Sequence, residues 1–387
     1  MRIIYFGTYR KDYVRNRMLI DGLRFHGVEV IECQQDIWRS TDERIQAVIA
    51  GWHEPRFWFH LISVYTKLIT EFLKISDFDT VVVGYPGHLD VLIARLLTWL
   101  KKKPLAWDIL MSLVLISTDR NLQTYSRLGI GLLKILETIS LRLPDMLFID
   151  TLAYRDWFVS NYQVNINKFR IIPIGADDRY FQKDDSRRIT KNMSLTVIYY
   201  GTYIPNHGTK IIIETIKLLA NDTDIKFFMV GEGPDRQYCF DEAKKFNLNN
   251  VEFIDWLEKD ELIPLINRSD IVLGSFGIVS QSFLTIHNKV YEGMAMMKAV
   301  ITGDSPAIRE VFTDKKELLL CKRGDPQCLA EAIVLLKKDS GLKNLIAHNG
   351  HEYYITHSTL ELMGARMKKF LDELLLSKQR IKQLPVN

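Results

Sequence analysis

Short apolar runs separated by polar segments dominate this sequence, and they predict alternating strands and helices. In the first half the predicted strands cover residues 2–7, 28–33, 80–88, 103–112, 144–151 and 169–181, and a helix is expected at 18–26. In the second half they cover 195–201, 227–233, 251–255 and 271–274, and helices are expected at 211–221 and 290–297. Uninterrupted apolar strands that alternate with helices are typical of parallel sheets covered on both faces. We therefore predict an α/β fold.

Chain length and a local change in composition divide the chain into two domains of similar size. A chain of 387 residues exceeds what one hydrophobic core usually organises. Residues 182–193 are charged and poor in apolar side chains, which indicates an exposed linker. We predict an N-terminal domain at 1–181 and a C-terminal domain at 194–358. Apolar residues at helical spacing predict a final helix within 359–387.

Charge and cysteine content favour a soluble, cytoplasmic enzyme. The chain has 51 Lys and Arg against 47 Asp and Glu, and this net charge of +4 gives no reason to expect a nucleic-acid partner. Its four cysteines lack zinc-type spacing, and no apolar run approaches the roughly 20 residues that span a bilayer. Basic residues interleaved with leucines between 95 and 142 leave two interpretations open, an anionic membrane surface or a helix packed on the sheet.

Residues 271–300 combine the features of a site for a phosphorylated ligand. An apolar run ends in a turn of small residues, 274–277, where backbone amides can approach a ligand. A helix is expected to begin near Asn288, and its first turn carries free N–H groups suited to an anion. Lys289 and Glu292 are three positions apart, so both lie near one face of that helix. The alternative is a surface pair that meets only water.

Other candidate contacts lie at the ends of strands in the first half. Asp108 and His88 follow apolar runs at the edge where open parallel sheets bind ligands, although a helix cap and a turn explain them equally well. Arg15 and Arg17 make the first loop cationic, as a solvated turn would also do. That loop lacks GxGxxG, which argues against a dinucleotide site. Residues 77–79 read Asp-Phe-Asp but precede a strand, so we interpret them as a loop and expect no metal.

The second half resembles the retaining glycosyltransferases of family 4. The motifs that carry the resemblance are GTYIPNHG at 201–208, VGEGPD at 230–235, VEFIDWLEKDEL at 251–262, RSDIVLGSFG at 268–277 and NKVYEGMAMMKAVITGDSPAIRE at 288–310. The resemblance implies the GT-B fold, in which two Rossmann-like domains face a central cleft. It also implies that the terminal helix crosses back to the N-terminal domain.

The resemblance assigns residues to a nucleotide-sugar donor. The glutamate at Glu292 would bind the ribose, and backbone groups of the glycine loops would meet the diphosphate and sugar. The donor-binding residues implied in this way are Gly201, Thr202, Gly208, Gly231, Ser275, Gly277, Ile278, Asn288 and Glu292. The chain departs from the family where a second glutamate is usual, since Leu284 stands eight residues before Glu292. It also lacks the usual arginine and lysine, at the positions of Thr202 and His207.

The leading hypothesis is therefore a glycosyltransferase that uses a nucleotide sugar and a glycan or lipid-linked acceptor, with no cofactor. We predict Asp108, Lys289 and His207 as catalytic residues; Lys289 is the first choice for stabilising the leaving diphosphate. Arg15, Arg17 and His88 are predicted on the acceptor side. A nucleotide-sugar epimerase and a noncatalytic GT-B scaffold stay open as alternatives.

Overall fold

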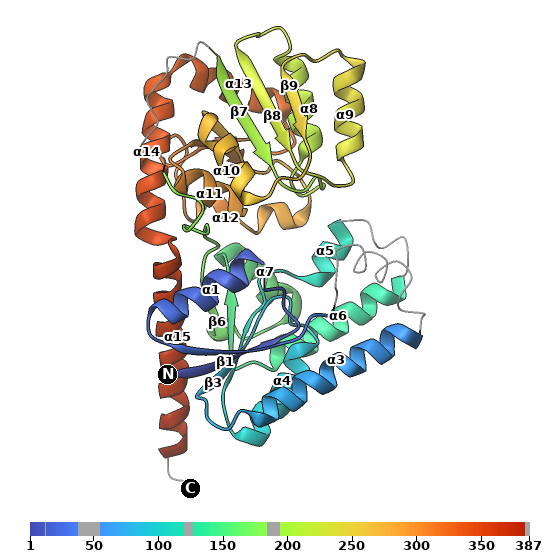
Figure 1. Ribbon diagram of the computed structural model, residues 1–387, viewed down its shortest axis with the longest axis vertical. Helices are drawn as coiled ribbons and strands as arrows, with labels where there is room; N and C mark the ends of the chain where they lie inside the picture. The colour runs from blue at the N-terminus through green and yellow to red at the C-terminus, as the bar shows by residue number, and fades with distance from the viewer. Residues whose placement is uncertain (12, 38–54, 120–126, 184–193, 384–387) are drawn as a thin grey trace.

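The computed structural model contains two domains, each built on a six-stranded parallel sheet (Figure 1). It describes residues 1–387 except 12, 38–54, 120–126, 184–193 and 384–387, so most of the predicted linker, 182–193, lies outside the described residues. The first sheet ends at Ile171 and the second begins at Leu195. Two parallel sheets flanked by helices confirm the predicted α/β class.

The N-terminal sheet has the strand order β2-β1-β3-β4-β5-β6. Its strands are β1 (Arg2–Gly7), β2 (Glu29–Gln34), β3 (Thr80–Val83), β4 (Leu105–Asp108), β5 (Met146–Ile149) and β6 (Phe169–Ile171). Its helices are α1 (Val14–Phe25), α3 (Pro55–Lys74), α4 (Asp90–Lys101), α5 (Leu113–Asp119), α6 (Arg127–Arg142) and α7 (Leu152–Tyr162). Strands β3, β4 and β5 are buried along their whole length, as expected for a parallel sheet covered on both faces.

The C-terminal sheet has the order β12-β11-β10-β7-β8-β9. Its strands are β7 (Leu195–Tyr200), β8 (Ile225–Val230), β9 (Val251–Ile254), β10 (Ile271–Leu273), β11 (Ala299–Gly303) and β12 (Leu319–Cys321). Its helices are α8 (Thr209–Leu218), α9 (Arg236–Lys245), α10 (Lys259–Arg268), α11 (Asn288–Ala295), α12 (Pro306–Arg309), α13 (Pro326–Lys338) and α14 (Ser340–His357). Because β7, β8 and β10 are parallel, the loops that follow them emerge at one edge of the sheet.

Helix α1 begins earlier than the sequence pattern predicts. Arg15 and Arg17, predicted on a polar loop, lie in its first turn. Arginine is a good helix former, and Arg15 is buried because a carboxylate partner compensates its charge. The polar appearance of this segment therefore reflects paired charges and not a solvated loop.

The final helix, α15 (Leu360–Gln383), packs against α1 of the N-terminal domain and crosses it (Figure 1). Met363, Met367 and Leu371 are buried in the same hydrophobic cluster as residues of α1 and the N-terminal sheet. Gly22 and Gly364 let the two backbones touch, because a Cβ added to Gly364 would lie 2.2 Å from the carbonyl of Gly22. The last segment of the chain is thus part of the N-terminal domain's core.

We expect Gly364→Ala to destabilise the protein by about 1–3 kcal/mol, because the added methyl group would force α15 away from α1. Thermal unfolding measures the effect. Gly131→Ala in α6 is a matched control, since a Cβ there meets no atom within 4 Å. If Gly364→Ala were as stable as the parent protein, this close packing would be contradicted.

Candidate functional site

Glycines bring the loops after β7, β8 and β10 into backbone contact. Gly201, Gly208 and Gly231 have positive φ angles of 125°, 71° and 121°. A Cβ on Gly231 would lie 2.2 Å from the carbonyl oxygen of Gly201, and one on Gly208 would lie 2.5 Å from the amide nitrogen of Gly277. No larger residue fits these positions without a backbone shift. Four of the predicted donor-binding glycines therefore form one structural unit.

The loop between β7 and α8 holds His207 by its backbone. His207 Nδ1 lies 2.6 Å from the carbonyl oxygen of Thr202, which also accepts a hydrogen bond of 2.9 Å from the Tyr199 hydroxyl. A carbonyl oxygen only accepts, so Nδ1 carries the proton that His207 donates to it. The imidazole can therefore act as a cation only when Nε2 is protonated as well.

The loop after β10, Gly274 to Ile278, is called the donor loop below. Ser275 is fully buried, and its Oγ lies 2.8 Å from His287 Nδ1. Gly277 packs so tightly that a Cβ would lie 2.1 Å from the carbonyl oxygen of Pro205. The Ile278 side chain is 67% exposed, so its backbone is the part suited to a ligand contact.

Lys289 is a buried ammonium group at the start of α11. Its side chain is buried, and its Nζ has no hydrogen-bond partner among the described residues. Nζ lies 4.1 Å from the centroid of the Tyr199 ring, and a Cβ on Gly201 would lie 3.3 Å from it. Burial lowers the pKa of Lys289 to about 7, against the opposite effect of Glu292. A buried cation without a hydrogen bond is costly, and a bound anion would remove that cost.

Glu292 is also buried, one helical turn after Lys289. Burial raises its pKa to about 7, while Tyr200 and Lys289 act in the opposite direction. Across the part of the chain that the structure describes, no ion pair joins Lys289 to Glu292. The alternative of a surface pair in water is therefore wrong. Asn288 is the first residue of α11, the helix that carries Lys289 and Glu292.

Sequence reasoning missed two residues at this site, His287 and Arg323. His287 Nε2 is buried without a partner in the described chain, and burial, Lys289 and Arg323 keep the pKa of the imidazole well below its usual value. Arg323 follows β12 and donates to carbonyl oxygens of the donor loop. His287 could have been noticed beside Asn288, but no local pattern marks Arg323.

Asp108 and Arg15, predicted as catalytic and acceptor-side residues, bind each other. Arg15 Nε and Nη2 each approach Asp108 to 2.7 Å, and both side chains are buried. Arg15 also donates to the carbonyl oxygen of Ile172 at 2.9 Å. Burial alone would lower the pKa of Arg15, but Asp108 raises it above its ordinary value. This pair helps to hold the N-terminal domain together. A contact of either residue with a sugar stays a prediction.

His88, predicted on the acceptor side, is buried at the end of the same sheet. Its Nε2 lies 3.0 Å from Glu137 of α6, and its ring packs edge-on against Trp107. Burial would raise the pKa of Glu137, but hydrogen bonds from His88, Tyr162 and Ser112 lower it below its ordinary value. His88 is thus a partner of a buried carboxylate, and its assignment to the acceptor side stays a prediction.

Arg17 lies where the two domains meet. Its Nη2 is 2.5 Å from Asp177, which also pairs with Arg179 and with Lys259 of α10. Burial opposes ionisation of Asp177, yet these cations lower its pKa to about 2. Arg17 is therefore engaged in a network that joins α1, the segment after β6 and α10.

The segment where the family would place its second glutamate contacts the N-terminal domain. Leu284 packs against that domain's hydrophobic cluster, and its carbonyl oxygen accepts a hydrogen bond from Thr151. The hydroxyl of Thr285 donates to Asp150, and the backbone N–H of Gln281 donates to the Asp119 carboxylate at 3.0 Å. An apolar residue at 284 therefore has a structural reason, which is contact between the domains.

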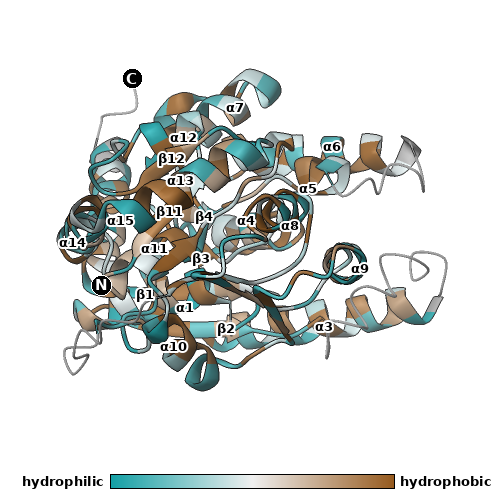
Figure 2. Ribbon diagram, turned by 90° about the horizontal axis from the view of Figure 1, so that it is seen from above, coloured by the Kyte–Doolittle hydropathy of each residue, from teal (hydrophilic) through white to brown (hydrophobic). Residues whose placement is uncertain are grey.

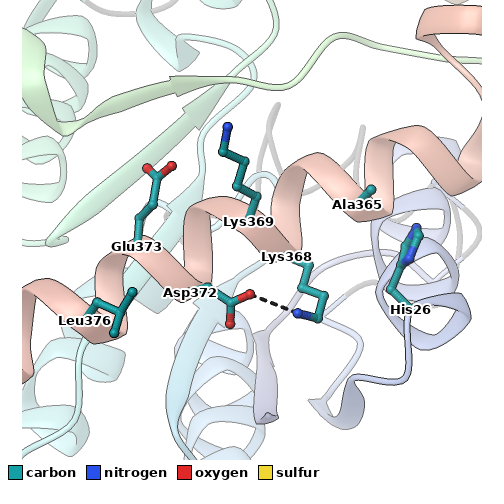
Figure 3. A pocket seen from close by; sticks show the side chains of 7 residues that line it. All are labelled: His26, Ala365, Lys368, Lys369, Asp372, Glu373 and Leu376. Atoms are coloured by element: carbon teal, nitrogen blue, oxygen red, sulfur yellow. Dashed lines mark hydrogen bonds and ion pairs between the residues drawn. The ribbon is translucent and has the colours of Figure 1, made fainter.

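A surface pocket of about 430 Å³ lies away from these loops, beside α15 (Figure 3). It is lined by His26, Ala365, Lys368, Lys369, Asp372, Glu373 and Leu376. Lys368 and Asp372 form an ion pair of 2.9 Å, while Lys369 and Glu373 point away from His26 (Figure 3). The pocket contains none of the predicted site residues, so the candidate site is the group of loops around Lys289.

Comparisons with known proteins place this chain among glycosyltransferase-like sequences over part of its length. The family model for glycosyl transferases group 1 matches residues 194–339. The glycosyltransferase MJ1178 of Methanocaldococcus jannaschii is 26% identical over 156 residues, which are 40% of this chain and 42% of that protein. LpsE of Rhizobium meliloti, a lipopolysaccharide core biosynthesis glycosyltransferase, is 22% identical over 179 residues, 44% of this chain and 50% of that protein. The chain thus spans half or less of the length of these relatives.

A solved structure extends the likeness to the whole fold. HepE of Anabaena, crystallised in complex with UDP, superimposes with a TM-score of 0.70 and 12% identity over 96% of this chain and 99% of that chain. At this identity the likeness concerns the fold alone, and the predicted GT-B architecture is confirmed. Membership of family 4 in particular stays a prediction.

Proposed function

We propose that this chain, whose residues 194–339 match the family model for glycosyl transferases group 1 and whose fold is GT-B, transfers a sugar from a nucleoside diphosphate donor with retention of anomeric configuration. One observation carries the proposal: the buried Lys289 ammonium group lies close to Gly201 and has no hydrogen-bond partner among the described residues. A diphosphate is the anion that this place suits. The complex of HepE with UDP supports that choice.

In the proposed reaction the bond between the anomeric carbon and the diphosphate oxygen breaks, and its electron pair stays on the diphosphate. Lys289 and the N-terminus of α11 stabilise the added negative charge. The acceptor hydroxyl forms the new bond on the face that the diphosphate leaves, and its proton passes to the leaving group. Because Leu284 replaces the expected glutamate, we assign no carboxylate nucleophile. We expect no metal or cofactor requirement, since this chain supplies positive charge itself.

Incubation of the purified protein with a panel of nucleoside diphosphate sugars tests the proposal. Release of nucleoside diphosphate with a new glycosidic product is the expected result. Binding of a nucleotide sugar without transfer or hydrolysis would instead indicate a noncatalytic scaffold. Conversion of the donor into another free nucleotide sugar would indicate an epimerase.

Glu292→Gln is expected to weaken nucleotide binding about tenfold, because hydrogen bonds from ribose hydroxyls to a carboxylate are stronger than those to an amide. The shape of α11 should be retained, since both residues are good helix formers. Calorimetric titration with nucleoside diphosphates measures the change, and the exposed Glu261→Gln is a control. An unchanged dissociation constant would remove Glu292 from the site.

We propose that the acceptor is a glycan or a lipid-linked glycan and that the protein works at the cytoplasmic face of a membrane. Helices α3 and α6 extend toward the same side of the molecule with mixed apolar and polar faces (Figures 1 and 2). Exposed apolar residues flank the basic positions Lys134 and Lys101 to Lys103. They are Leu132, Ile135 and Ile139 in α6 and Leu96, Trp99 and Leu100 in α4.

Across the described residues, no helix is long and apolar enough to cross a bilayer. We propose contact with the membrane surface through the exposed apolar and basic side chains of α4 and α6. Co-sedimentation with anionic vesicles is the test. Binding at low salt that weakens at high salt is expected, because screening reduces attraction between lysines and lipid headgroups. Absence of binding at low salt would contradict the surface contact.

A further inference from the structure

Arg323 has a set of partners that sequence motifs do not explain. It follows β12, is 7% exposed, and directs its guanidinium at three backbone carbonyl oxygens. Nη1 donates to Ser275 at 3.1 Å and to Gly277 at 3.2 Å, and Nε donates to Asp304 at 2.9 Å. Two of these three acceptors belong to the donor loop. The guanidinium thus ties that loop to the segment after β11.

The positive charge of Arg323 is not neutralised by an ion pair. Across the described residues no carboxylate lies within ion-pair distance of it, and the carboxylate of Asp304 pairs instead with Arg309 at 2.7 Å. Burial lowers the pKa of Arg323 to about 10, so the group stays charged at neutral pH. Its charge also reaches His287, whose pKa it helps to lower. Arg323 therefore adds positive potential at the buried imidazole of His287.

The hydrogen bonds of Arg323 also orient the donor-loop amides. Peptide bonds in the described chain are trans apart from Tyr85-Pro86, and a trans peptide directs its N–H opposite to its C=O. Since the Gly277 carbonyl points at Arg323, the Ile278 N–H points away from it. The Phe276 N–H is already used, because it donates to the carbonyl oxygen of His207 at 3.0 Å. The Ile278 amide is the donor whose direction Arg323 fixes.

We propose that Arg323 is a positioning residue for the diphosphate of the donor. It holds the Gly277–Ile278 peptide so that the N–H of this peptide faces the ligand. It also supplies a second positive charge, in a chain that has Thr202 and His207 in place of the family's cations. This inference rests on the proposed function, because it requires a nucleoside diphosphate at the donor loop. The planar guanidinium group of arginine has several N–H donors and can bridge these carbonyl oxygens, whereas the single ammonium group of lysine cannot.

The variants Arg323→Lys and Arg323→Met test this role, with Arg309→Met as a matched control. Arg309 contacts the same residue, Asp304, but only through the exposed carboxylate. Calorimetric titrations use inorganic pyrophosphate, the nucleoside diphosphate that the parent binds, and the corresponding nucleoside. We expect both Arg323 variants to lose about tenfold or more in affinity for the two diphosphate ligands, since hydrogen bonds to charged groups are involved. Affinity for the nucleoside and all affinities of Arg309→Met should match the parent.

Two results would overturn the inference. If Arg323→Lys bound the diphosphate ligands as tightly as the parent does, a positive charge without the guanidinium geometry would be sufficient. Equal losses for nucleoside and diphosphate, together with a lower melting temperature, would show a merely structural role. Failure of the parent itself to bind any nucleoside diphosphate would contradict the proposed function instead, so the two failures are distinguishable.

Discussion

Replacing Lys289 by methionine is expected to lower turnover by about 10²- to 10³-fold, the usual effect of removing one group that stabilises transition-state charge. Donor affinity should fall less, because the leaving diphosphate carries most charge in the transition state. Methionine has a similar length and no charge, so the buried volume is conserved. The ammonium group has no partner among the described residues, so no hydrogen bond of the unliganded protein is lost.

The same substitution is expected to stabilise the unliganded protein. Burial lowers the pKa of Lys289 from 10.5 to about 7, a difference of about 5 kcal/mol. Between these pH values the unfolded chain binds the proton and the folded protein does not, so parental stability rises with pH across that window. Below pH 7 both states are protonated and the full cost of the buried charge is present. The stability gain of Lys289→Met should therefore be largest below pH 7 and shrink toward pH 10.

Turnover and thermal unfolding of Lys289→Met, measured across pH, test both effects. Lys210→Met is the matched control, because Lys210 is half-exposed on α8 and pairs with Asp235 at 2.8 Å. His207→Gln tests the rival, because activity that depends on an imidazolium declines as rising pH removes its second ring proton. Parental turnover in Lys289→Met together with loss in His207→Gln would assign the charge to the histidine. Lower stability of Lys289→Met would contradict the buried, unpaired ammonium group.

The fold could be predicted because its information is local. Fully apolar segments such as 80–83 and 146–149 indicate strands covered on both faces, and each is followed by a helical segment. The order of the strands does not follow from these runs, and only the structure shows it. The start of α1 was misplaced because paired arginines look like a solvated loop.

The candidate site could be predicted where its residues are neighbours in sequence. Lys289 and Glu292 share one helix, and the glycine loops each follow a strand directly. Sequence reasoning did not find the pairings between residues that are distant in sequence. Asp108 binds Arg15, 93 positions away, and His88 binds Glu137, 49 positions away. A single sequence does not show such pairings, so strand-end polar residues were assigned to ligands.

Asp108→Ala is expected to destabilise the protein by about 3–5 kcal/mol, because it leaves the Arg15 guanidinium buried without its carboxylate. Asp108 is fully buried and Arg15 is 2% exposed, so water cannot replace the lost partner without opening the domain. The effect is on stability and not on a contact with sugar. Turnover per folded molecule should therefore survive at low temperature.

A second variant separates the charge from the packing. The double variant Arg15→Met and Asp108→Leu removes both charges, and it should recover more than half of the lost stability because neither ion is left unpaired. Recovery should be incomplete, since Arg15 also satisfies the carbonyl oxygen of Ile172. Arg24→Met, which breaks an exposed pair with Glu32, is the control and should change stability by less than about 1 kcal/mol. Denaturant unfolding measures all three, and an Asp108→Ala protein that unfolds like the parent but has lost turnover would return Asp108 to the reaction.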